Sequence, residues 1–319
     1  MPQIIRPAER SDINALHDFT NSLSNIHRHL DWRDVLEWLG RQPFWICEED
    51  RRVMAALACP AEPPEVAWVR LFGVSTRLQL DQTWQRLFER ALEYQAGCKP
   101  RPAIVTLALR DWYEDLIKRN GFVHHQDIVV FLYDAQPPAP PKLNKPILLR
   151  EMNDDDLEKV RTIDHLAFEP IWRLSMDDLH YASAKSSYCT VAELDGEIIG
   201  YTMSSSSGVY AHLARLAVRP DLQHQHLGFA LVQDLLDHFI NRLNYWGVTL
   251  NTQNNNTASL ALYHKIGFRE TGERFPVFIY PWEGNRRIGT WALRRFGAQE
   301  ERKNRAVGAG EPRPGSDLR

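Results

Sequence analysis

Hydrophobic positions along the chain change between the two-residue spacing of strands and the wider spacing of helices. Residues 188–194 and 197–203 fit strands, and the Asp195-Gly196 pair between them is a strong signal for a two-residue hairpin turn. From Gly228 onward, apolar residues recur at helical spacing and form one stripe. The stripe consists of Leu231, Val232, Leu235, Leu236, Phe239 and Ile240. The pattern predicts a chain that combines strands with amphipathic helices.

Other segments of the second half complete this pattern. Asn153–Asp155 offers caps for one helix, and Ser175 followed by Asp178 resembles a capping box for another. Further elements are expected at 147–149 (strand), 212–218 (strand), 247–250 (strand), 259–265 (helix) and 275–280 (strand). The order β-α-α-β-β-β-α-β-α-β predicts an α/β fold with a mixed sheet covered by helices.

Composition divides the chain into parts. Five of the twelve residues 135–146 are proline, which favours an extended spacer. Residues 296–319 contain almost nothing apolar, so we expect a disordered tail. Two domains are therefore expected, at 1–134 and 147–295, joined by the 135–146 linker.

The two domains share one sequence pattern, which occurs twice along the chain. An offset of 144 residues places Val69–Val74 on Leu213–Val218, and near the end of each half an offset of 146 places Gly121-Phe122 on Gly267-Phe268. A nearly constant offset over this span favours a tandem duplication. The alternative is that two α/β domains share generic strand and helix patterning.

Charge and cysteine content narrow the classes of function. The 319 residues carry 38 basic and 41 acidic side chains, a formal charge of -3, so nothing indicates nucleic acid or an anionic membrane as a partner. No window approaches the ~20 apolar residues of a bilayer span. The four cysteines include no CxxC pair, so packing thiols are expected and no metal site. A cytoplasmic protein is expected, and the pattern does not predict its oligomeric state.

One segment of the second half is suited to binding an anion. A strand is expected to end at Val218, a turn follows, and a helix begins near Gly228. Backbone N–H groups at a helix N-terminus have no partner within the helix and attract negative groups such as phosphate.

This segment, Gln223-His224-Gln225-His226-Leu227-Gly228 with Ala230 behind it, resembles the GNAT superfamily of acyl-CoA N-acyltransferases. Members typically show Arg/Gln-x-x-Gly-x-Gly/Ala here, and His226 departs from that pattern at the first glycine. The resemblance implies acetyl-CoA as co-substrate, bound by this loop and by main-chain groups of the preceding strand. The positions implied are Leu216, Val218, Gln223, His224, Gln225, His226, Gly228 and Ala230.

A second segment extends the resemblance. The family pattern Asn-x-x-Ala/Ser-x-x-x-Tyr-x-x-x-Gly-Phe is matched by Asn256, Ser259, Tyr263 and Gly267-Phe268. By resemblance, Asn256 and Ser259 belong to the cofactor-binding positions, and Tyr263 protonates the departing thiolate. A phenol within reach of the sulfur stabilises charge as the thioester breaks.

The general base is left open between three candidates. His212 is the nearest titratable group on the strand where related peptide acetyltransferases carry a glutamate, and an imidazole accepts a proton near neutral pH. Glu193 is a second candidate, and a chain of water molecules is the third.

The first half keeps the sequence pattern of the fold but lacks the residues at the cofactor-binding and proton-donor positions. Gln79 matches the loop glutamine, but Trp84 stands at the position of the helix glycine, where we expect its indole to fill the pyrophosphate space. Arg110 and Ile117 replace the asparagine and tyrosine of the second motif. We therefore expect a degenerate GNAT-like domain in residues 1–134.

The leading hypothesis is an N-acetyltransferase. It moves an acetyl group from acetyl-CoA to a primary amine of a small molecule or a peptide N-terminus, by direct attack in a ternary complex. The alternative is a non-catalytic acyl-CoA sensor or interaction module, and a third option is a structural partner-binding protein.

Overall fold

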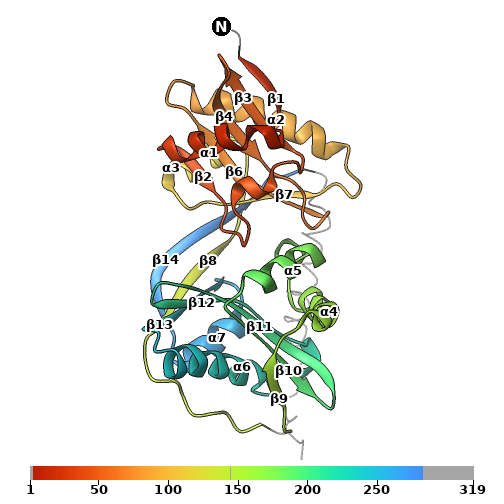
Figure 1. The fold of residues 1–319 in the computed structure, drawn as a ribbon, viewed down its shortest axis with the longest axis vertical. Coiled ribbons are helices and arrows are strands. Elements are labelled where there is room, and N and C mark those ends of the chain that lie inside the picture. The colour runs from red at the N-terminus through yellow and green to blue at the C-terminus, as the bar shows by residue number, and fades with distance from the viewer. Residues whose placement is uncertain (1–2, 144, 283–319) are drawn as a thin grey trace, which may run out of the picture.

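A computed structural model describes residues 3–143 and 145–282. Figure 1 shows the two halves of the chain stacked along the long axis, the first in red to orange and the second in green to cyan. The strands form two sheets, one of five strands and one of nine. The predicted mixed α/β fold is confirmed.

The five-stranded sheet belongs to the first half and is antiparallel. Its order is β1 (Ile4–Pro7), β3 (Phe44–Glu49), β4 (Arg52–Ala58), β6 (Leu71–Val74) and β2 (Ile26–Arg28). The α-helices of this half are α1 (Ile13–Ser22), α2 (Leu80–Ala96) and α3 (Asp111–Arg119). Helix α2 buries Trp84, Leu87 and Phe88 against the sheet, as its apolar stripe predicts.

The nine-stranded sheet extends through both halves. Its order is β5 (Val66–Trp68), β7 (Ala103–Leu107), β14 (Arg269–Ile279), β8 (Val123–Tyr133), β13 (Gly247–Gln253), β12 (Tyr210–Val218), β11 (Glu197–Ser207), β10 (Tyr188–Leu194) and β9 (Leu148–Glu151). Most neighbours are antiparallel, but β12 runs parallel to β13 and β5 runs parallel to β7. One hydrogen-bonded ladder therefore connects the halves.

The halves exchange strands where they meet. Strand β8 of the first half pairs with β13 of the second along Ile128–Tyr133, and β14 of the second half pairs with β7 of the first along Val277–Ile279. Figure 1 shows β8 and β14 running together from one half to the other. Each half thus completes the sheet of its partner, so the two cannot move as independent bodies without breaking ladder hydrogen bonds.

Helices cover the second half of the large sheet on both faces. On one face lie α4 (Leu157–Ala167) and α5 (Met176–Lys185), and on the other lie α6 (Leu227–Leu236) and α7 (Thr257–Ile266). A π-helical stretch, Asp237–Arg242, continues α6. The expected helix starts are confirmed: Asn153 Oδ1 accepts from the backbone N–H of Asp155, and Ser175 Oγ from that of Asp178. The hairpin at Asp195-Gly196 is also confirmed, with φ of 53° and 81°.

The proline-rich stretch lies between β8 and β9. Its described residues form no helix or strand. The expected tail at 296–319, and the end of the expected second domain, fall outside the described residues. The limits of the two domains remain predictions, because the exchange of β8 and β14 shares one sheet between them.

A buried apolar cluster fills the junction between the halves. It combines Trp68 of the first half with Ile171 from the segment between α4 and α5, and includes Ile128 and Val277 of the exchanged strands. The Trp68 Nε1–H donates to the carbonyl of Ile171 at 3.1 Å. The first half therefore holds the α4–α5 segment of the second.

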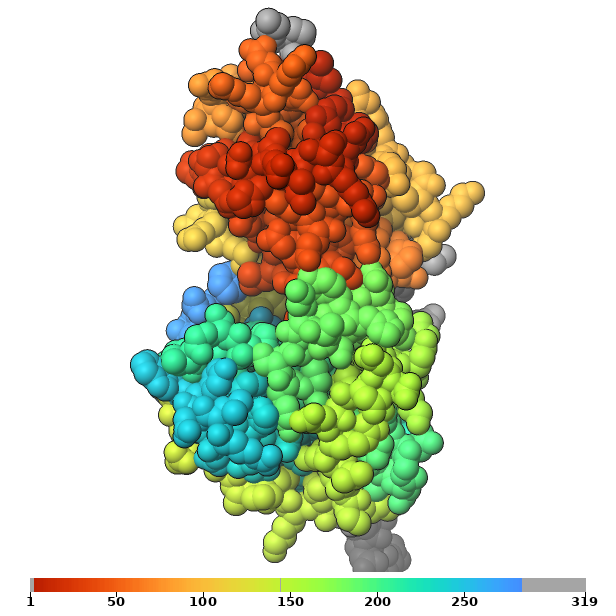
Figure 2. All heavy atoms as spheres, in the orientation of Figure 1, coloured from red at the N-terminus to blue at the C-terminus, as the bar shows by residue number. Residues whose placement is uncertain are grey.

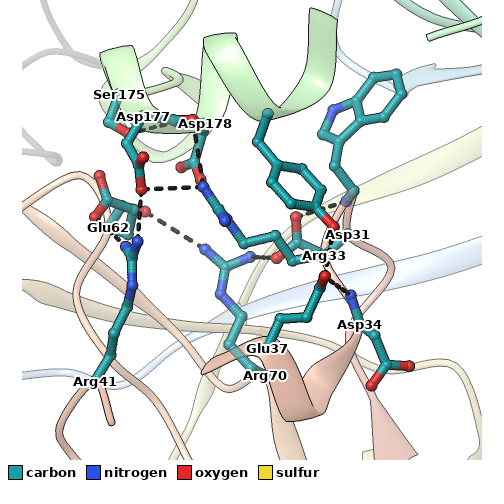
Figure 3. A network of polar contacts seen from close by, with 12 residues as sticks. Asp31, Arg33, Asp34, Glu37, Arg41, Glu62, Arg70, Ser175, Asp177 and Asp178 are labelled. Carbon is teal, nitrogen blue, oxygen red and sulfur yellow. Dashed lines mark hydrogen bonds and ion pairs between the residues drawn. The ribbon is translucent and has the colours of Figure 1, made fainter. Parts of the chain in front are cut away.

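An ionic network lies beside this cluster (Figure 3). Arg33 contacts Asp178 and Asp177 at the start of α5, with nitrogen–oxygen distances of 3.3 and 3.0 Å. The Arg70 guanidinium pairs with Asp31 and also donates to the Glu62 carbonyl. Burial raises the pKa of the Asp178 carboxyl to about 6, although nearby Arg70 and Arg33 act in the opposite direction.

The ionisation of Asp178 and that of Asp177 are expected to change the free energy of unfolding in opposite directions. Because the folded chain keeps the Asp178 proton up to about pH 6, ionisation of Asp178 lowers the free energy of unfolding as pH rises from 4 to 7. At 1.36 kcal/mol per pKa unit, a rise from 3.8 to about 6 corresponds to about 3 kcal/mol. Urea unfolding of the Asp178→Asn variant at pH 4.5 and 7.5 should show that this part of the pH dependence is lost.

The control is Asp177→Asn, one residue away. The Arg41 guanidinium lowers the pKa of Asp177, so its ionised form stabilises the fold above its usual pKa, and this stabilisation is lost as pH falls. Asp177→Asn should therefore lower stability at pH 7.5 and change it little near pH 3. Equal pH profiles for the two variants would contradict the assignment.

Candidate active site

Strand β12 leaves its neighbour β13 halfway along its length. The two strands pair from Tyr210 opposite Gly247 to Leu213 opposite Leu250, and there the pairing stops, although β12 continues to Val218. A register shift in the pairing with β11 at the same point leaves Ala214 as a bulge. Beyond the bulge, β12 pairs only with β11, and its other edge is open.

The open edge carries main-chain groups of two predicted residues. The backbone N–H of Arg219 donates to Ile199 of β11 at 2.8 Å. In an antiparallel pair, alternate residues share one edge, so Ala217 also faces β11. Leu216 and Val218 therefore direct their N–H and C=O groups toward the open edge. This arrangement is the one that sequence predicts for pairing with an extended ligand chain.

The first half closes the corresponding edge. Strand β6 stands 144 residues before Arg215–Val218, and β2 pairs with it through Ile26, His27 and Arg28. The His27 ring adds a contact to the Val69 carbonyl at 3.1 Å. An internal strand thus occupies the position that is free in the second half.

The expected role of Trp84 is wrong. Helix α2 begins at Leu80, so Trp84 lies in its second turn, fully buried against Phe72 and Phe88. The indole belongs to the core and not to the helix entrance. Strand β2, which the sequence does not predict, pairs with β6 on the edge that is open in the second half.

The loop before α6 contains two left-handed residues. His224 has φ +65° and His226 has φ +64°, and His226 is the N-cap of α6. Glycine adopts this conformation without a steric penalty, and histidine is among the residues that tolerate it. At the glycine position of the family pattern, this chain thus has a residue that adopts the left-handed conformation favoured by glycine.

This shape leaves backbone donors free. From His224 to Phe229, no backbone N–H donates to a protein acceptor, and the first that does is Ala230, to the His226 carbonyl at 3.0 Å. Free donors at the start of a helix form a favourable site for a phosphate group. The exposed imidazoles of His224 and His226 flank the same turn.

Two other loop residues have structural partners. The Gln223 side-chain amide donates to the Val218 carbonyl at 3.2 Å, which joins the loop to the end of β12. Gly228 allows α7 to approach α6, because a Cβ atom there would lie 3.1 Å from the Leu262 side chain. The loop, β12 and both helices are thereby held in one arrangement.

Asn256 and Ser259 begin α7. The Asn256 Oδ1 accepts from the Ser259 backbone N–H at 3.3 Å, and its Nδ2 lies 3.4 Å from Gln253 Oε1. The structure thus shows Asn256 as a helix cap at the end of β13. Its contact with the cofactor stays a prediction.

Tyr263 lies on α7, 5% exposed, with its ring near Phe131 and Phe268. Burial raises the pKa of its hydroxyl well above 10, while a hydrogen bond with Ser259 acts in the opposite direction. The phenol therefore keeps its proton at neutral pH and remains a hydrogen-bond donor.

His212 lies at the point where β12 and β13 begin to separate. Its Nδ1 is 2.9 Å from Thr249 Oγ1, and the Thr249 hydroxyl donates to the Ala211 carbonyl at 3.2 Å. Because that proton is used, Nδ1 of His212 donates to Thr249 and Nε2 keeps its lone pair. Burial lowers the pKa of the imidazole, so it is neutral and able to accept a proton at pH 7.

Glu193 is held in an ion pair. It accepts from the Arg150 guanidinium at 2.6 and 3.1 Å, and the same guanidinium binds Asp156. This triad joins β9 and β10 on the far side of the second half from β13. Of the two side-chain candidates, His212 is the one that lies beside the open edge of β12, and a chain of water molecules stays open as the third.

A buried ion pair connects β12 to the α4–α5 segment. Arg215 donates through Nε and Nη2 to Asp164 of α4, at 2.9 and 2.6 Å, and also to the Trp172 carbonyl. The Tyr201 hydroxyl donates to the same Asp164 oxygen. The sequence reading missed this pair, and a buried Asp in α4 has no local signal that identifies its partner 51 residues away.

The described part of the chain comprises residues 3–143 and 145–282. Within it, no group of three or more His, Cys, Asp or Glu side chains could hold a metal ion. Nor does it contain a helix both long and apolar enough to cross a membrane.

Comparison with known proteins agrees with this geometry. The family model of the GNAT acetyltransferases matches residues 157–268, which contain β12, the loop, α6 and α7. The second half of the chain is similar in sequence to the GNAT family of acetyltransferases. GNAT enzymes use acetyl-CoA, and the free donors and the open strand edge fit that co-substrate.

Individual relatives cover different parts of the chain. An uncharacterized N-acetyltransferase of Methanocaldococcus jannaschii is 27% identical over 124 residues, 39% of this chain and 79% of that protein. The spore coat polysaccharide biosynthesis protein SpsD of Bacillus subtilis is 25% identical over 159 residues, 48% of this chain and 54% of that protein. This chain is thus similar to only about half of SpsD.

The fold of the whole chain resembles that of a tandem protein. A tandem GNAT protein from the clavulanic acid biosynthesis pathway aligns with 87% of this chain and 98% of its own, at a TM-score of 0.59 and 16% identity. The expected arrangement of two GNAT-like halves in tandem is therefore confirmed at the level of fold.

The left-handed backbone at residue 226 gives a direct test of the loop. His226→Gly and His226→Asn should keep acetyl-CoA affinity within about threefold, because both residues adopt positive φ. His226→Val should weaken binding by about tenfold, since a β-branched residue disfavours this conformation. Isothermal titration calorimetry measures the three dissociation constants. Equal binding by the Val and Gly variants would show that the backbone of this loop does not shape the site.

Proposed function

We propose that the second half transfers an acetyl group from acetyl-CoA to a primary amine of a small molecule or a peptide N-terminus. The observation that carries this proposal is the open edge of β12 beyond the Ala214 bulge, next to the free N–H groups before α6. An extended pantetheine arm pairs with such an edge while its diphosphate accepts from the N–H groups.

The cofactor-binding residues act mainly through their backbone. In this proposal, the loop from Gln223 to Gly228 holds the diphosphate through its N–H groups, and Ala230 packs at the start of α6 behind it. The main-chain groups of Leu216 and Val218 bind the pantetheine arm. Asn256 and Ser259 position the start of α7 and contact the cofactor from the other side of the open edge.

The chemical step needs a base and a proton donor. The neutral Nε2 of His212 accepts a proton from the substrate ammonium, and the free amine attacks the thioester carbon. Backbone N–H groups of β12 stabilise the oxyanion, and Tyr263 donates to the departing sulfur. Nitrogen gains the acetyl group and gives its second proton to the Tyr263 oxygen, while the carbon–sulfur bond breaks and CoA leaves as the thiol.

His212 tests this function most directly. His212→Gln keeps a hydrogen-bonding side chain and removes the titratable nitrogen, so kcat should fall by 10²–10³-fold at pH 7. Its acetyl-CoA dissociation constant should stay within twofold, because the cofactor contacts are elsewhere. CoA release in a panel of amines, followed by a thiol reagent from pH 5.5 to 9, measures the rate.

The matched control is His238→Gln, on the π-helical stretch after α6, where the ring stacks on Tyr188 at 3.7 Å. It should retain the full rate and the pH profile. A His212→Gln variant with unchanged rate would assign the proton to water. An unmodified chain that binds acetyl-CoA and acetylates no amine would be the sensor of the alternative hypothesis.

A further inference from the structure

Strands β11, β12 and β13 carry polar side chains on one face, next to His212. Ala211 and Leu213 of β12 pack toward α6 in a buried cluster, so Tyr210 and His212 lie on the opposite face, toward α4 and α5. Ser205 and Ser207 of β11 stand opposite His212 and Tyr210 in the register. On β13, Thr249 and Asn251 lie on this face, because Val248 and Leu250 pack with α6. These six residues are called the polar floor.

Among the described residues, α4 and α5 pack beyond the polar floor and not on it. The cluster under α4 and α5 includes Met203 and Ala217, which lie on the same face but beyond the Ala214 bulge. Asn251 is exposed although β13 is internal to the sheet, and Ser205, His212 and Thr249 are half-buried. Parallel strands such as β12 and β13 are usually covered on both faces, so an open polar stretch here is accessible to a ligand.

The surface is hollowed beside these strands. Figure 2 shows a recess between the two halves, bordered by the green α5 region, by the blue end of β14 and by the green-teal turn between β11 and β12. The polar floor includes the residues at both sides of that turn, Ser207 and Tyr210.

The polar floor is uncharged. It offers hydroxyls from Ser205, Ser207 and Thr249, the Asn251 amide and the imidazole of His212, whose pKa is lowered by burial. The nearest cation along β12, Arg215, is neutralised by Asp164. Recognition of a carboxylate or a polycation uses an opposite charge, whereas hydroxyl and amide groups pair with hydroxyls.

Two exposed aromatic rings lie at one end of the polar floor. Tyr210 is 40% exposed and Trp246 is 68% exposed, with ring centres 6.4 Å apart at an interplanar angle of 82°. The backbone N–H of Trp246 donates to the Val209 carbonyl at 2.9 Å, which fixes this corner. Exposed aromatic rings bury the apolar CH face of a sugar ring, while the hydroxyls of that sugar reach polar neighbours.

We propose that the acceptor is an amino sugar, bound with its hydroxyls on the polar floor and its ring against Tyr210 and Trp246. This proposal rests on the proposed function and names its substrate class. The sugar amine loses a proton to His212 and forms the amide bond, the thioester carbon–sulfur bond breaks, and the products are the N-acetylated sugar and CoA.

A comparison of three amines tests the class. D-glucosamine, an alanine-terminated hexapeptide and spermidine are each titrated at saturating acetyl-CoA, with CoA release measured by a thiol reagent and the product by mass spectrometry. We expect kcat/KM for glucosamine to exceed the other two by at least tenfold. A preference for the peptide or for spermidine, or equal rates with all three, would overturn the amino-sugar proposal and leave the acetyltransferase function standing.

A pair of asparagine variants tests the location. Asn251→Leu removes the amide with little change in size and should raise KM for glucosamine about tenfold while kcat and the acetyl-CoA dissociation constant change less than twofold. Asn241→Leu, an exposed position whose amide contacts Asp237 on the π-helical stretch, is the control and should match the unmodified chain. Trp246→Ala, at an exposed ring, should raise the same KM by a similar factor.

The two levels of the proposal fail differently. If KM for glucosamine does not change in Asn251→Leu or Trp246→Ala, the binding position is wrong although the chemistry holds. If calorimetry shows acetyl-CoA binding but none of the three amines is acetylated, the proposed function itself fails, and the amino-sugar proposal fails with it.

Discussion

The structure depends on one unpaired strand edge in the middle of a sheet. Unpaired backbone groups are costly unless a partner satisfies them, and sheets usually end where such edges occur. Here β12 separates from β13 after Leu213, and β13 finds its other partner in β8 of the first half. The exchanged strand keeps β13 in place while the edge of β12 stays free. The degenerate half therefore supports the site of the other half through the shared sheet, the Trp68–Ile171 hydrogen bond and the ionic network.

Divergence of the two halves follows from the same constraint. The pattern of residues 69–74 and 213–218 is shared, and the two segments form β6 and the end of β12. In the first half, the short β2 pairs with β6 and closes it. A change of side chains in the loop would weaken cofactor binding. A strand paired along the edge, as β2 pairs with β6, leaves no backbone groups there for a ligand.

Local patterns predicted much of the second half. Hairpin turns, helix caps and apolar stripes depend on neighbouring residues, so strands at 188–194 and 197–203 and the starts of α5 and α6 follow from sequence, although the second strand continues to Ser207. The loop positions also follow from a motif of six residues. Contacts over long distances do not: the exchange of β8 and β14, the β2 edge and the Arg215–Asp164 pair have no local signature. The position of Trp84 also did not follow from sequence. The alignment of the two halves places it at a helix entrance, whereas α2 begins at Leu80.

Removing a single outward backbone donor tests the central claim most directly. Leu216→Pro eliminates an N–H on the open edge of β12, a position where proline is tolerated because no ladder bond is lost. Leu216→Ala, which keeps the N–H, is its control, and circular dichroism verifies that both fold. Calorimetry should show that the unmodified chain binds one acetyl-CoA. The proline variant should bind it about tenfold more weakly, which corresponds to the loss of one hydrogen bond of about 1.4 kcal/mol. The affinity of the alanine variant should stay within threefold of that of the unmodified chain. Equal affinities for the two folded variants would contradict pairing of the cofactor with β12.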